Sequence, residues 1–365
     1  MPGKFIRTSF SDINLDDPFF DSLKADYPGN SVSTGFCEWF RRKAFEGKEA
    51  LVFEDEQGIG AFVNIKENEA EEIKLKDGII LPADERLKIS TIKIDERYRN
   101  QRIGEGALGL TLWQWRNCKS DQIYVTVFEK HQSLIQLLEK YGFNYVGDNF
   151  NEERVYIKDR RHIDFSDPCK AFPFLSKQYD HAGCLAIDMG YHDTMFAFSE
   201  LANTLQEKID ISVANGLKKV YIGSPYSLAF REGDPVFIYR KFTGQDGKPG
   251  YKSCITSYCI VTQIRTVKNN GRAALSYDEY RRFIGNKSVY SEQELKEKYV
   301  SSKNLTLIEL LYYGFFGAGN NVNWVWLKNN NCWPDNHPMS FRYSKEQFYK
   351  IMQEGKVDVK NVIID

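Results

Sequence analysis

The chain has 365 residues, of which 42% are hydrophobic and 27% charged, and its formal net charge is −1. This ordinary globular composition excludes collagen-like, low-complexity and disordered proteins, and the length predicts two domains. Residues 1–160 are net acidic and the remainder is net basic. A mildly basic second half permits an anionic partner, but it lacks the clustered charge of a dedicated DNA-binding protein.

No apolar stretch approaches the roughly 20 residues that span a bilayer, so we expect no membrane segment. The best candidate, residues 305–318, is too short and contains Glu309, and we predict that it forms a core helix. The seven cysteines are an odd number, and the N-terminus lacks the charged-then-apolar pattern of a signal peptide. We therefore expect a reducing, cytoplasmic location without disulfides.

The first half predicts strands that alternate with helices. Strands are expected at residues 4–8, 50–54, 59–66, 87–94, 123–128 and 154–158, and helices at 16–26, 33–46, 103–117 and 133–140. The charge-dense residues 67–77 are expected to form a solvated loop. This order predicts an α/β domain that ends near residue 160.

The second half reads differently. Residues 161–180 contain two prolines and little periodicity, and we predict a linker there. Short strand-like runs follow at 184–187, 220–223, 235–240 and 258–267, separated by turns rich in Gly, Pro and Asp, with a helix at 291–299. Residues 181–365 are therefore predicted to form a small β-barrel with peripheral helices.

The strongest motif is Gln-Arg-Ile-Gly-Glu-Gly at residues 101–106, between a predicted strand and a predicted helix. Small residues let the backbone approach a ligand closely, and the first amides of a helix attract an anion such as a phosphate. Arg99 and Arg102 would add charge-assisted contacts. The motif therefore predicts a phosphate-binding loop.

A dinucleotide site is one interpretation of this loop. Gly104, Gly106 and Gly109 have the required spacing, and Glu129 follows twenty residues after Gly109. However, a dinucleotide fold needs a strand that runs almost directly into the glycines. Here about nine mostly polar residues separate Ile94 from Gly104, and the strand is the fourth of its domain rather than the first.

The same stretch resembles the GCN5-related N-acetyltransferase (GNAT) family, whose acetyl-CoA loop reads Gln/Arg-x-x-Gly-x-Gly/Ala. Gln101, Gly104 and Gly106 fill its fixed positions, and residues 140–143 (Lys-Tyr-Gly-Phe) match a second signature at a helix end. The resemblance implies a GNAT fold with a mixed central sheet, and acetyl-CoA as the cofactor. The cofactor-binding residues it implies are Ile92, Ile94, Arg99, Gln101, Arg102, Ile103, Gly104, Glu105 and Gly106.

The catalytic groups depart from the common family pattern. The usual general-acid tyrosine lies four residues before the glycine of the Gly-Phe signature, where this chain has Leu138. Tyr141, one turn later, is the candidate acid, with core packing as the alternative. The candidate base is Glu85, at the foot of the fourth strand, and His131 replaces a common asparagine. Two carboxylates are alternatives for the base: Asp84 and Glu96.

The second half resembles the ASCH group of PUA-like barrels in residues 218–223, 233–240 and 259–264. Such barrels are typically associated with RNA. Tyr221 and Gly223 stand where many ASCH domains have an acid and an arginine, so the resemblance does not extend to hydrolase activity. The His and Cys spacings match no zinc pattern, and we expect no metal. A phosphate-facing surface is predicted from Arg231, Arg240, Lys241, Lys252 and Arg265.

The resulting hypothesis is an acetyl-CoA-dependent N-acetyltransferase whose amine acceptor is carried by RNA. A tRNA, an aminoacyl-tRNA or a modified base would be recruited by the PUA-like domain. One alternative is a non-catalytic module that senses CoA or binds RNA. Another is an N-acetyltransferase for proteins or small amines, with the barrel used for partner contact or homodimer formation.

Overall fold

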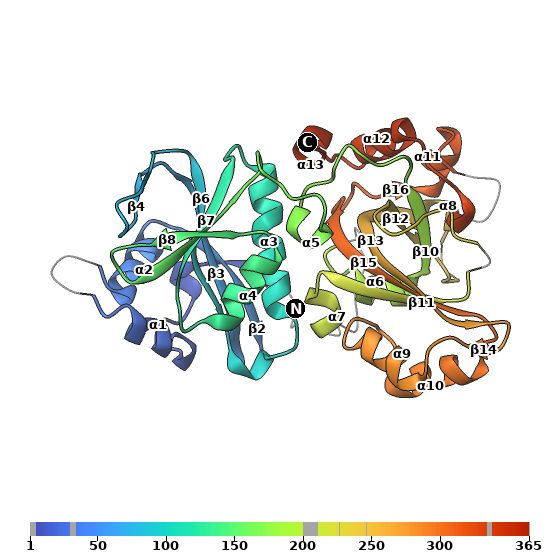
Figure 1. The fold of residues 1–365 in the computed structure, drawn as a ribbon, viewed down its shortest axis with the longest axis horizontal. Coiled ribbons are helices and arrows are strands. Elements are labelled where there is room, and N and C mark those ends of the chain that lie inside the picture. The colour runs from blue at the N-terminus through green and yellow to red at the C-terminus, as the bar shows by residue number, and fades with distance from the viewer. Residues whose placement is uncertain are drawn as a thin grey trace. The chain divides into compact units, whose positions relative to one another are not determined.

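The computed structural model describes residues 5–29, 34–199, 211–225, 227–245, 247–333 and 338–364. The chain divides into two compact units, Met1–His162 and Ile163–Asp365 (Figure 1). The stretch predicted to be a linker therefore belongs largely to the second unit. It contains the helix α5 (Pro168–Ala171), and the side chains of Phe172 and Phe174 are fully buried. Sequence periodicity did not predict that this segment is packed, because its only helix is four residues long and is too short to show a periodic pattern.

The first unit is built on a seven-stranded sheet in the order β1-β2-β3-β6-β7-β9-β8. All neighbours are antiparallel except β6 and β7, which are parallel, so the sheet is mixed as expected. The strands are β1 (Phe5–Ser9), β2 (Glu49–Asp55), β3 (Gly58–Glu69), β6 (Arg86–Ile94), β7 (Gln122–Phe128), β8 (Asn144–Asp148) and β9 (Glu153–Asp159).

Two aromatic residues of α2 explain how the sheet is covered on one face. Phe36 and Phe40 recur at helical spacing and pack against Phe20 and Phe62 in a buried cluster. The helix α3, which follows the loop motif in the sequence, packs against β3 and β6. The helices are α1 (Asp21–Asp26), α2 (Phe36–Phe45), α3 (Ile103–Asn117) and α4 (Gln132–Lys140), with short 3₁₀ turns at Phe10–Asp12, Pro18–Phe20 and Glu96–Tyr98.

Residues 67–77 differ from the expected solvated loop. They include β4 (Ile73–Lys74), which pairs with β5 (Ile80–Leu81). Leu75 is 1% exposed and packs with Tyr124 and Val155, so this excursion covers part of the sheet. The strand β8 was also not anticipated from the sequence, since its five residues carry little apolar alternation.

The parallel pair β6–β7 opens along its length. Its register runs from Arg86 opposite Gln122 to Ile89 opposite Val125, and no further pairing follows among the described residues of these strands. The rest of β6 stays paired with β3 on its other side, and the rest of β7 stays paired with β9. The two strands therefore splay apart in the half of the sheet that leads to the loop motif.

The second unit contains a half-barrel sheet in the order β10-β12-β13-β15-β11, with β14 and β16 paired to β13. The strands are β10 (Gly183–Asp188), β11 (Lys218–Gly223), β12 (Pro235–Lys241), β13 (Cys254–Asn269), β14 (Arg272–Ala273), β15 (Leu305–Phe315) and β16 (Val322–Asn323). The further helices are α6 (Met189–Met195), α7 (Ile211–Asn215), α8 (Pro249–Lys252), α9 (Tyr277–Ile284), α10 (Glu292–Ser301), α11 (Trp324–Asn329), α12 (Lys345–Glu354) and α13 (Val359–Val362). The helix expected near residue 295 is confirmed as α10.

The predicted core helix over residues 305–318 is wrong, because this segment forms β15. It lies between β11 and β13, and nine of its eleven residues are buried. A central strand that is covered on both faces has a continuous apolar sequence, which periodicity cannot distinguish from a buried helix. None of the helices in the described part of the chain is long and apolar enough to cross a membrane.

Candidate active site in the first unit

The loop between β6 and α3 is held in shape by its own backbone and side chains. The Asp95 carboxylate accepts a hydrogen bond from the amide of Arg97 at 2.9 Å, and Gln101 Nε2 donates to the Arg97 carbonyl at 3.3 Å. Asn100 and Arg102 have φ of 62° and 60°, which turns the chain into the start of α3. The first amides of α3 have no partner within the helix, so the loop presents donors and a positive helix end to an anion.

Glu105, which the motif assigned to cofactor binding, is instead enclosed by two cations. Its carboxylate lies 2.6 Å from Arg102 Nη2 and 2.8 Å from Lys140 Nζ, and the residue is 8% exposed. Burial acts to raise the pKa of Glu105, but the charges and hydrogen bonds of Arg102 and Lys140 outweigh it and lower the pKa to about 2. Glu105 therefore holds Arg102 in place beside the loop.

Two observations fit an anionic group in this loop. Arg102 Nη1 is buried, and it has no hydrogen-bond partner within the part of the chain that the structure describes. A Cβ atom at Gly104 would lie 3.5 Å from the nearest heavy atom, in Leu137, so packing does not require glycine there. Its small size instead leaves the backbone open to a ligand. Arg99 is exposed and pairs with Glu96 at 2.5 Å.

A cavity of about 210 Å³ lies where β6 and β7 separate. Ile92, which the resemblance assigned to cofactor binding, lines this cavity, whereas Ile94 lies nearer the loop, 3.9 Å from the Cβ position of Gly104. The remaining lining comes from both splayed strands and from the segment around α1, α2 and α4: Leu23, Asp26, Tyr27, Thr34, Phe36, Trp39, Ile89, Ser90, Thr91, Val125, Thr126, Val127, Phe128, His131 and Leu134.

A buried carboxylate stands behind this cavity. Glu153 on β9 is 5% exposed, and its Oε1 accepts hydrogen bonds from the Tyr27 hydroxyl at 2.7 Å and from Thr126 Oγ1 at 3.1 Å. Asn149 Nδ2 donates to Oε2 at 2.9 Å. Burial and the adjacent negative charge of Glu153 raise the pKa of Tyr27 well above its ordinary value. Tyr27 and Thr126 thus connect the cavity to a carboxylate.

A second acidic group lines the cavity directly. The Asp26 carboxylate contacts Lys130, and its Oδ2 lies 3.4 Å from His131 Nε2. The sequence had singled out His131 but gave no signal for Asp26, Tyr27 or Glu153. These three residues come from the end of α1 and from β9, which lie more than 120 positions apart in the chain.

The two predicted catalytic residues do not reach the cavity. Glu85 is exposed and precedes β6 at its paired end, about 23 Å along the strand from Ile92 at roughly 3.3 Å per residue. Tyr141 is fully buried, and its carbonyl accepts a hydrogen bond from Lys158 Nζ at 2.6 Å. Packing, the alternative for Tyr141, accounts for its position, and Leu138 is likewise fully buried.

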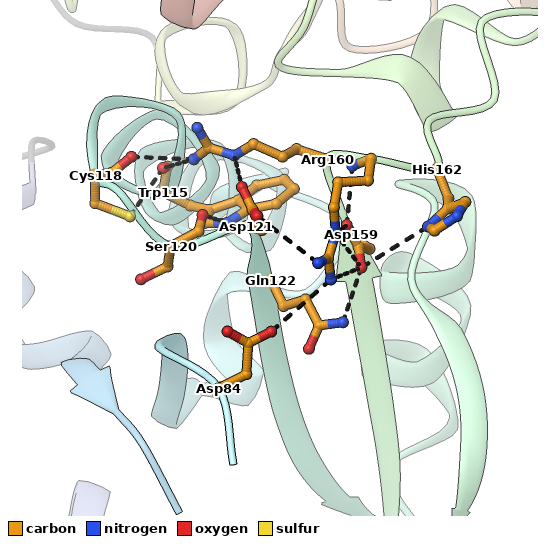
Figure 2. A network of polar contacts seen from close by, with 10 residues as sticks. Asp84, Trp115, Cys118, Ser120, Asp121, Gln122, Asp159, Arg160 and His162 are labelled. Carbon is orange, nitrogen blue, oxygen red and sulfur yellow. Dashed lines mark hydrogen bonds and ion pairs between the residues drawn. The ribbon is translucent and has the colours of Figure 1, made fainter. Parts of the chain in front are cut away.

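The paired end of β6 and β7 is braced by a polar network, which Figure 2 shows. Gln122 Nε2 donates to Asp159 Oδ2 at 2.8 Å, and Arg161 Nη2 lies 2.6 Å from the same oxygen. Arg160 Nη2 donates to the carbonyl of Trp115 at 2.9 Å, which ties the end of β9 to α3. Burial raises the pKa of Asp159, but hydrogen bonds from Arg161 and Gln122 outweigh it and lower the pKa to about 2.

Asp84 and Glu96, the alternatives for the base, are also occupied elsewhere. Asp84 faces Arg161 of this network at 3.8 Å (Figure 2), and Glu96 pairs with Arg99. One end of the strand pair is therefore clamped by charges, while the other end is open and lined by aromatic and polar groups.

The basic residues predicted to bind RNA do not form one surface. Arg240 is buried in a paired contact with Asp193, at 2.7 Å and 2.8 Å. Arg231 and Arg265 lie near one end of β12, whereas Lys241 and Lys252 lie near the other, together with Arg240. Lys241 pairs with Asp188 at 3.1 Å.

The second unit also holds a cavity of about 750 Å³, which the sequence did not reveal. Three tyrosines and two lysines are among the residues that line it: Tyr191, Tyr221, Tyr290, Lys241 and Lys298. The rings of Tyr191 and Tyr290 have centroids 4.8 Å apart, and Lys298 Nζ lies 4.3 Å from the centroid of the Tyr290 ring. Within the described ranges, no three His, Cys, Asp or Glu side chains gather as a metal site.

No family model matches the chain. A curated protein, the spermine/spermidine N(1)-acetyltransferase of Bacillus subtilis (strain 168), is 36% identical over 70 residues, which make up 18% of this chain and 45% of that protein. The chain therefore spans less than half the length of this relative.

Solved structures similar to the chain include members of both families that the sequence resembles. ASCH from Zymomonas mobilis is 12% identical, with a TM-score of 0.31 over 47% of this chain and 94% of its own. Arabidopsis thaliana NAA60 in complex with acetyl-CoA is 16% identical, with a TM-score of 0.31 over 43% and 99%. A GNAT family acetyltransferase from Elizabethkingia anophelis with acetyl-CoA bound is 13% identical, with a TM-score of 0.29 over 43% and 98%.

Proposed function

We propose that the first unit is an acetyl-CoA-dependent N-acetyltransferase that acts on an amine. The observation that carries this proposal is the splay of β6 from β7, directly before a loop that presents helix amides and Arg102. Backbone groups on the open side of β6 can bind an extended chain that carries amides, as an added strand would. The pantetheine arm of acetyl-CoA is such a chain, and its pyrophosphate suits the loop.

The residues proposed to hold acetyl-CoA follow from these positions. Ile92 contributes backbone along the cavity, and Ile94 continues it toward the loop. The amides of Ile103, Gly104 and Glu105 would face the pyrophosphate, whereas the Gly106 amide already donates to the Arg102 carbonyl at 3.2 Å. Gln101 keeps the loop closed. Arg102 supplies a buried donor and Arg99 an exposed positive charge.

The amine would enter from the side of α1 and α2. Asp26 lines the cavity with its charge offset by Lys130, and aromatic side chains such as Trp39 favour a cation over their faces. The cavity has a volume of about 210 Å³, and the pantetheine arm proposed above enters it along β6, so little space is left for the acceptor. A small amine is therefore the acceptor that we favour, and the name of the curated relative agrees with it.

An amine carried by RNA is the second candidate. It is supported by the cavity of the second unit, since paired tyrosines suit base stacking and lysines suit phosphates. Under this candidate, the second unit retains bulk tRNA with an affinity that falls steeply as salt rises.

Substitution of Gly104 tests the cofactor site. Gly104→Asp places a negative charge where the pyrophosphate would lie, while an acidic residue in the first turn favours the helix itself. We expect the acetyl-CoA affinity to fall about 100-fold, or about 2.7 kcal/mol, with little change in the melting temperature. Gly104→Ala, which adds a methyl group in ordinary contact with Leu137 but no charge, is the matched control and should lose much less affinity than Gly104→Asp.

Calorimetry with acetyl-CoA and with NAD distinguishes the two interpretations of the loop, and thiol release distinguishes an enzyme from a sensor. We expect free CoA to appear with spermidine, and bulk tRNA is the second acceptor to be measured. If acetyl-CoA binds but no free CoA is released with either acceptor, the enzymatic proposal is contradicted. A CoA-sensing module is then the remaining interpretation. Equal affinity of Gly104→Asp and wild type would contradict the cofactor site.

A further inference from the structure

We propose that Tyr27 and Glu153 remove the proton from the acceptor amine, with Tyr27 touching the amine and Glu153 accepting the phenolic proton behind it. The inference rests on the proposed acetyl transfer and adds the groups that activate the acceptor. In these terms Tyr27 is a catalytic residue, and Glu153 is a positioning residue that acts through it.

The geometry separates the two groups in the way that a proton relay requires. Tyr27 lines the cavity and is 37% exposed, whereas Glu153 is only 5% exposed. The Tyr27 hydroxyl donates to Glu153 Oε1 at 2.7 Å, and Thr126 and Asn149 fix the same carboxylate at 3.1 Å and 2.9 Å. A proton that reaches Tyr27 therefore has a defined acceptor.

Tyr27 is also held in position. Its carbonyl accepts a hydrogen bond from the amide of Phe36 at 2.9 Å, which connects the end of α1 to the start of α2. Its ring lies 5.4 Å from the ring of Phe128, at the splayed end of β7. Contacts of both its backbone and its ring therefore fix the position of Tyr27.

The chemistry explains why such a relay is useful. An aliphatic amine has a pKa near 10, so at neutral pH it is an ammonium ion without a lone pair for attack. In the proposed step, an ammonium N–H proton passes to Tyr27 Oη while the phenolic proton passes to Glu153 Oε1. The freed nitrogen forms a bond to the thioester carbonyl carbon, the C–S bond breaks, and the second N–H proton goes to the departing sulfur. The proton on Glu153 then returns to solvent.

Other charged groups face the same space and do not offer an equivalent path. Asp26 is engaged by Lys130 and by His131, and these three residues lie on the α1 and α4 side of the cavity. Of these groups only Asp26 is negative, and Lys130 offsets its charge. The pKa of Tyr27 is raised by burial and by Glu153, so Tyr27 stays a phenol that passes a proton on rather than a standing phenolate base.

The test uses two amines that differ in whether a proton must be removed. n-Butylamine is an ammonium ion at pH 7, whereas methoxyamine is already neutral. For Tyr27→Phe in the full chain, we expect kcat with n-butylamine to fall about 100-fold, which is the scale of one general base. The same variant should keep kcat with methoxyamine within about 3-fold of wild type, because that amine needs no deprotonation before attack.

Tyr145→Phe is the matched control. Tyr145 also donates to a carboxylate, Asp148 Oδ1 at 2.9 Å, but it is exposed on β8 and does not line the cavity. We expect wild-type kcat with both amines. An equal loss with both amines in Tyr27→Phe would assign Tyr27 a structural role and overturn the relay, as would no loss with n-butylamine.

Variants of Glu153 give a second measurement, with folding checked by circular dichroism. Glu153→Gln still accepts the Tyr27 hydrogen bond but takes up no proton, and its kcat with n-butylamine should rise with pH as free amine becomes available. Glu153→Asp should recover part of the lost activity. An unaltered pH profile in Glu153→Gln would overturn the relay. If wild type releases no CoA with spermidine or with either of these amines, acetyl transfer itself fails, and the relay falls with it.

Discussion

The two ends of the β6–β7 strand pair use ion pairs for different purposes. At the clamped end, Asp159 belongs to a network with Gln122 and with Arg161, whose side chain is 49% exposed. At the splayed end, Glu105 is enclosed by Arg102 and Lys140. Both carboxyls have pKa values lowered to about 2, yet only the second holds the loop proposed to bind acetyl-CoA. Similar electrostatics therefore brace the strand pair at one end and hold this loop at the other.

Loss of the Glu105 charge should give the largest effect on stability. Glu105→Gln leaves Arg102, whose side chain is 11% exposed, as a buried charge without its counterion. Breaking a buried pair in this way costs about 3 kcal/mol in the free energy of unfolding. Urea unfolding at pH 7 measures this loss. Glu129→Gln removes a pair whose carboxylate is 70% exposed, and this control should cost about 0.5 kcal/mol.

The same variant has an expected pH dependence. Because the folded pKa of Glu105 lies below its ordinary value of 4.5, its carboxylate stabilises the fold above that pH. This stabilisation is lost as the pH falls from about 4.5 toward 2. Glu105→Gln should therefore lose less stability than wild type over that range. Parallel acid unfolding of the two proteins would contradict the assignment of this pair.

At the clamped end we expect a smaller effect that leaves binding intact. Asp159→Asn keeps an acceptor for Gln122 and for Arg161 but removes the charge, and we expect a loss of about 1 kcal/mol. Its stabilising charge is lost as pH falls from 3.8 toward about 2. Calorimetry should give wild-type acetyl-CoA affinity. A substantial loss of affinity would show that the clamp also sets the width of the splay.

The loop could be predicted from the sequence because its information is local. Gln101, Gly104 and Gly106 lie within six consecutive residues, and their spacing predicts a helix start suited to an anion. The fold order of the first unit followed from periodicity for the same reason. Tyr27 and Glu153 could not be predicted in this way, since only the tertiary structure joins α1 to β9. The family resemblance instead selected Glu85, which lies at the clamped end.

The second unit shows a different limit. In β15, Glu309 interrupts an apolar run, and its carboxylate is satisfied by Lys218 and Lys287 at 3.0 Å and 2.6 Å. The sequence of a buried strand with one paired charge resembles that of a helix with one polar position, because the sequence does not show the partner of the charge. Arg240, which the sequence placed on a phosphate-facing surface, is instead buried in an ion pair with Asp193.

The smallest expected effect separates ligand contact from stability at the splayed end. Arg99 is 73% exposed and its partner Glu96 is 82% exposed, so their ion pair contributes about 0–1 kcal/mol. Arg99→Gln should leave the melting temperature unchanged and weaken acetyl-CoA binding about 5-fold at low salt, because a charge-assisted contact to phosphate is lost. The difference should narrow at high salt, where exposed charges are screened. Glu96→Gln frees Arg99 from its partner, and affinity should then be equal to or greater than that of wild type. Weaker binding in Glu96→Gln would mean that the pair, rather than Arg99 itself, shapes the loop.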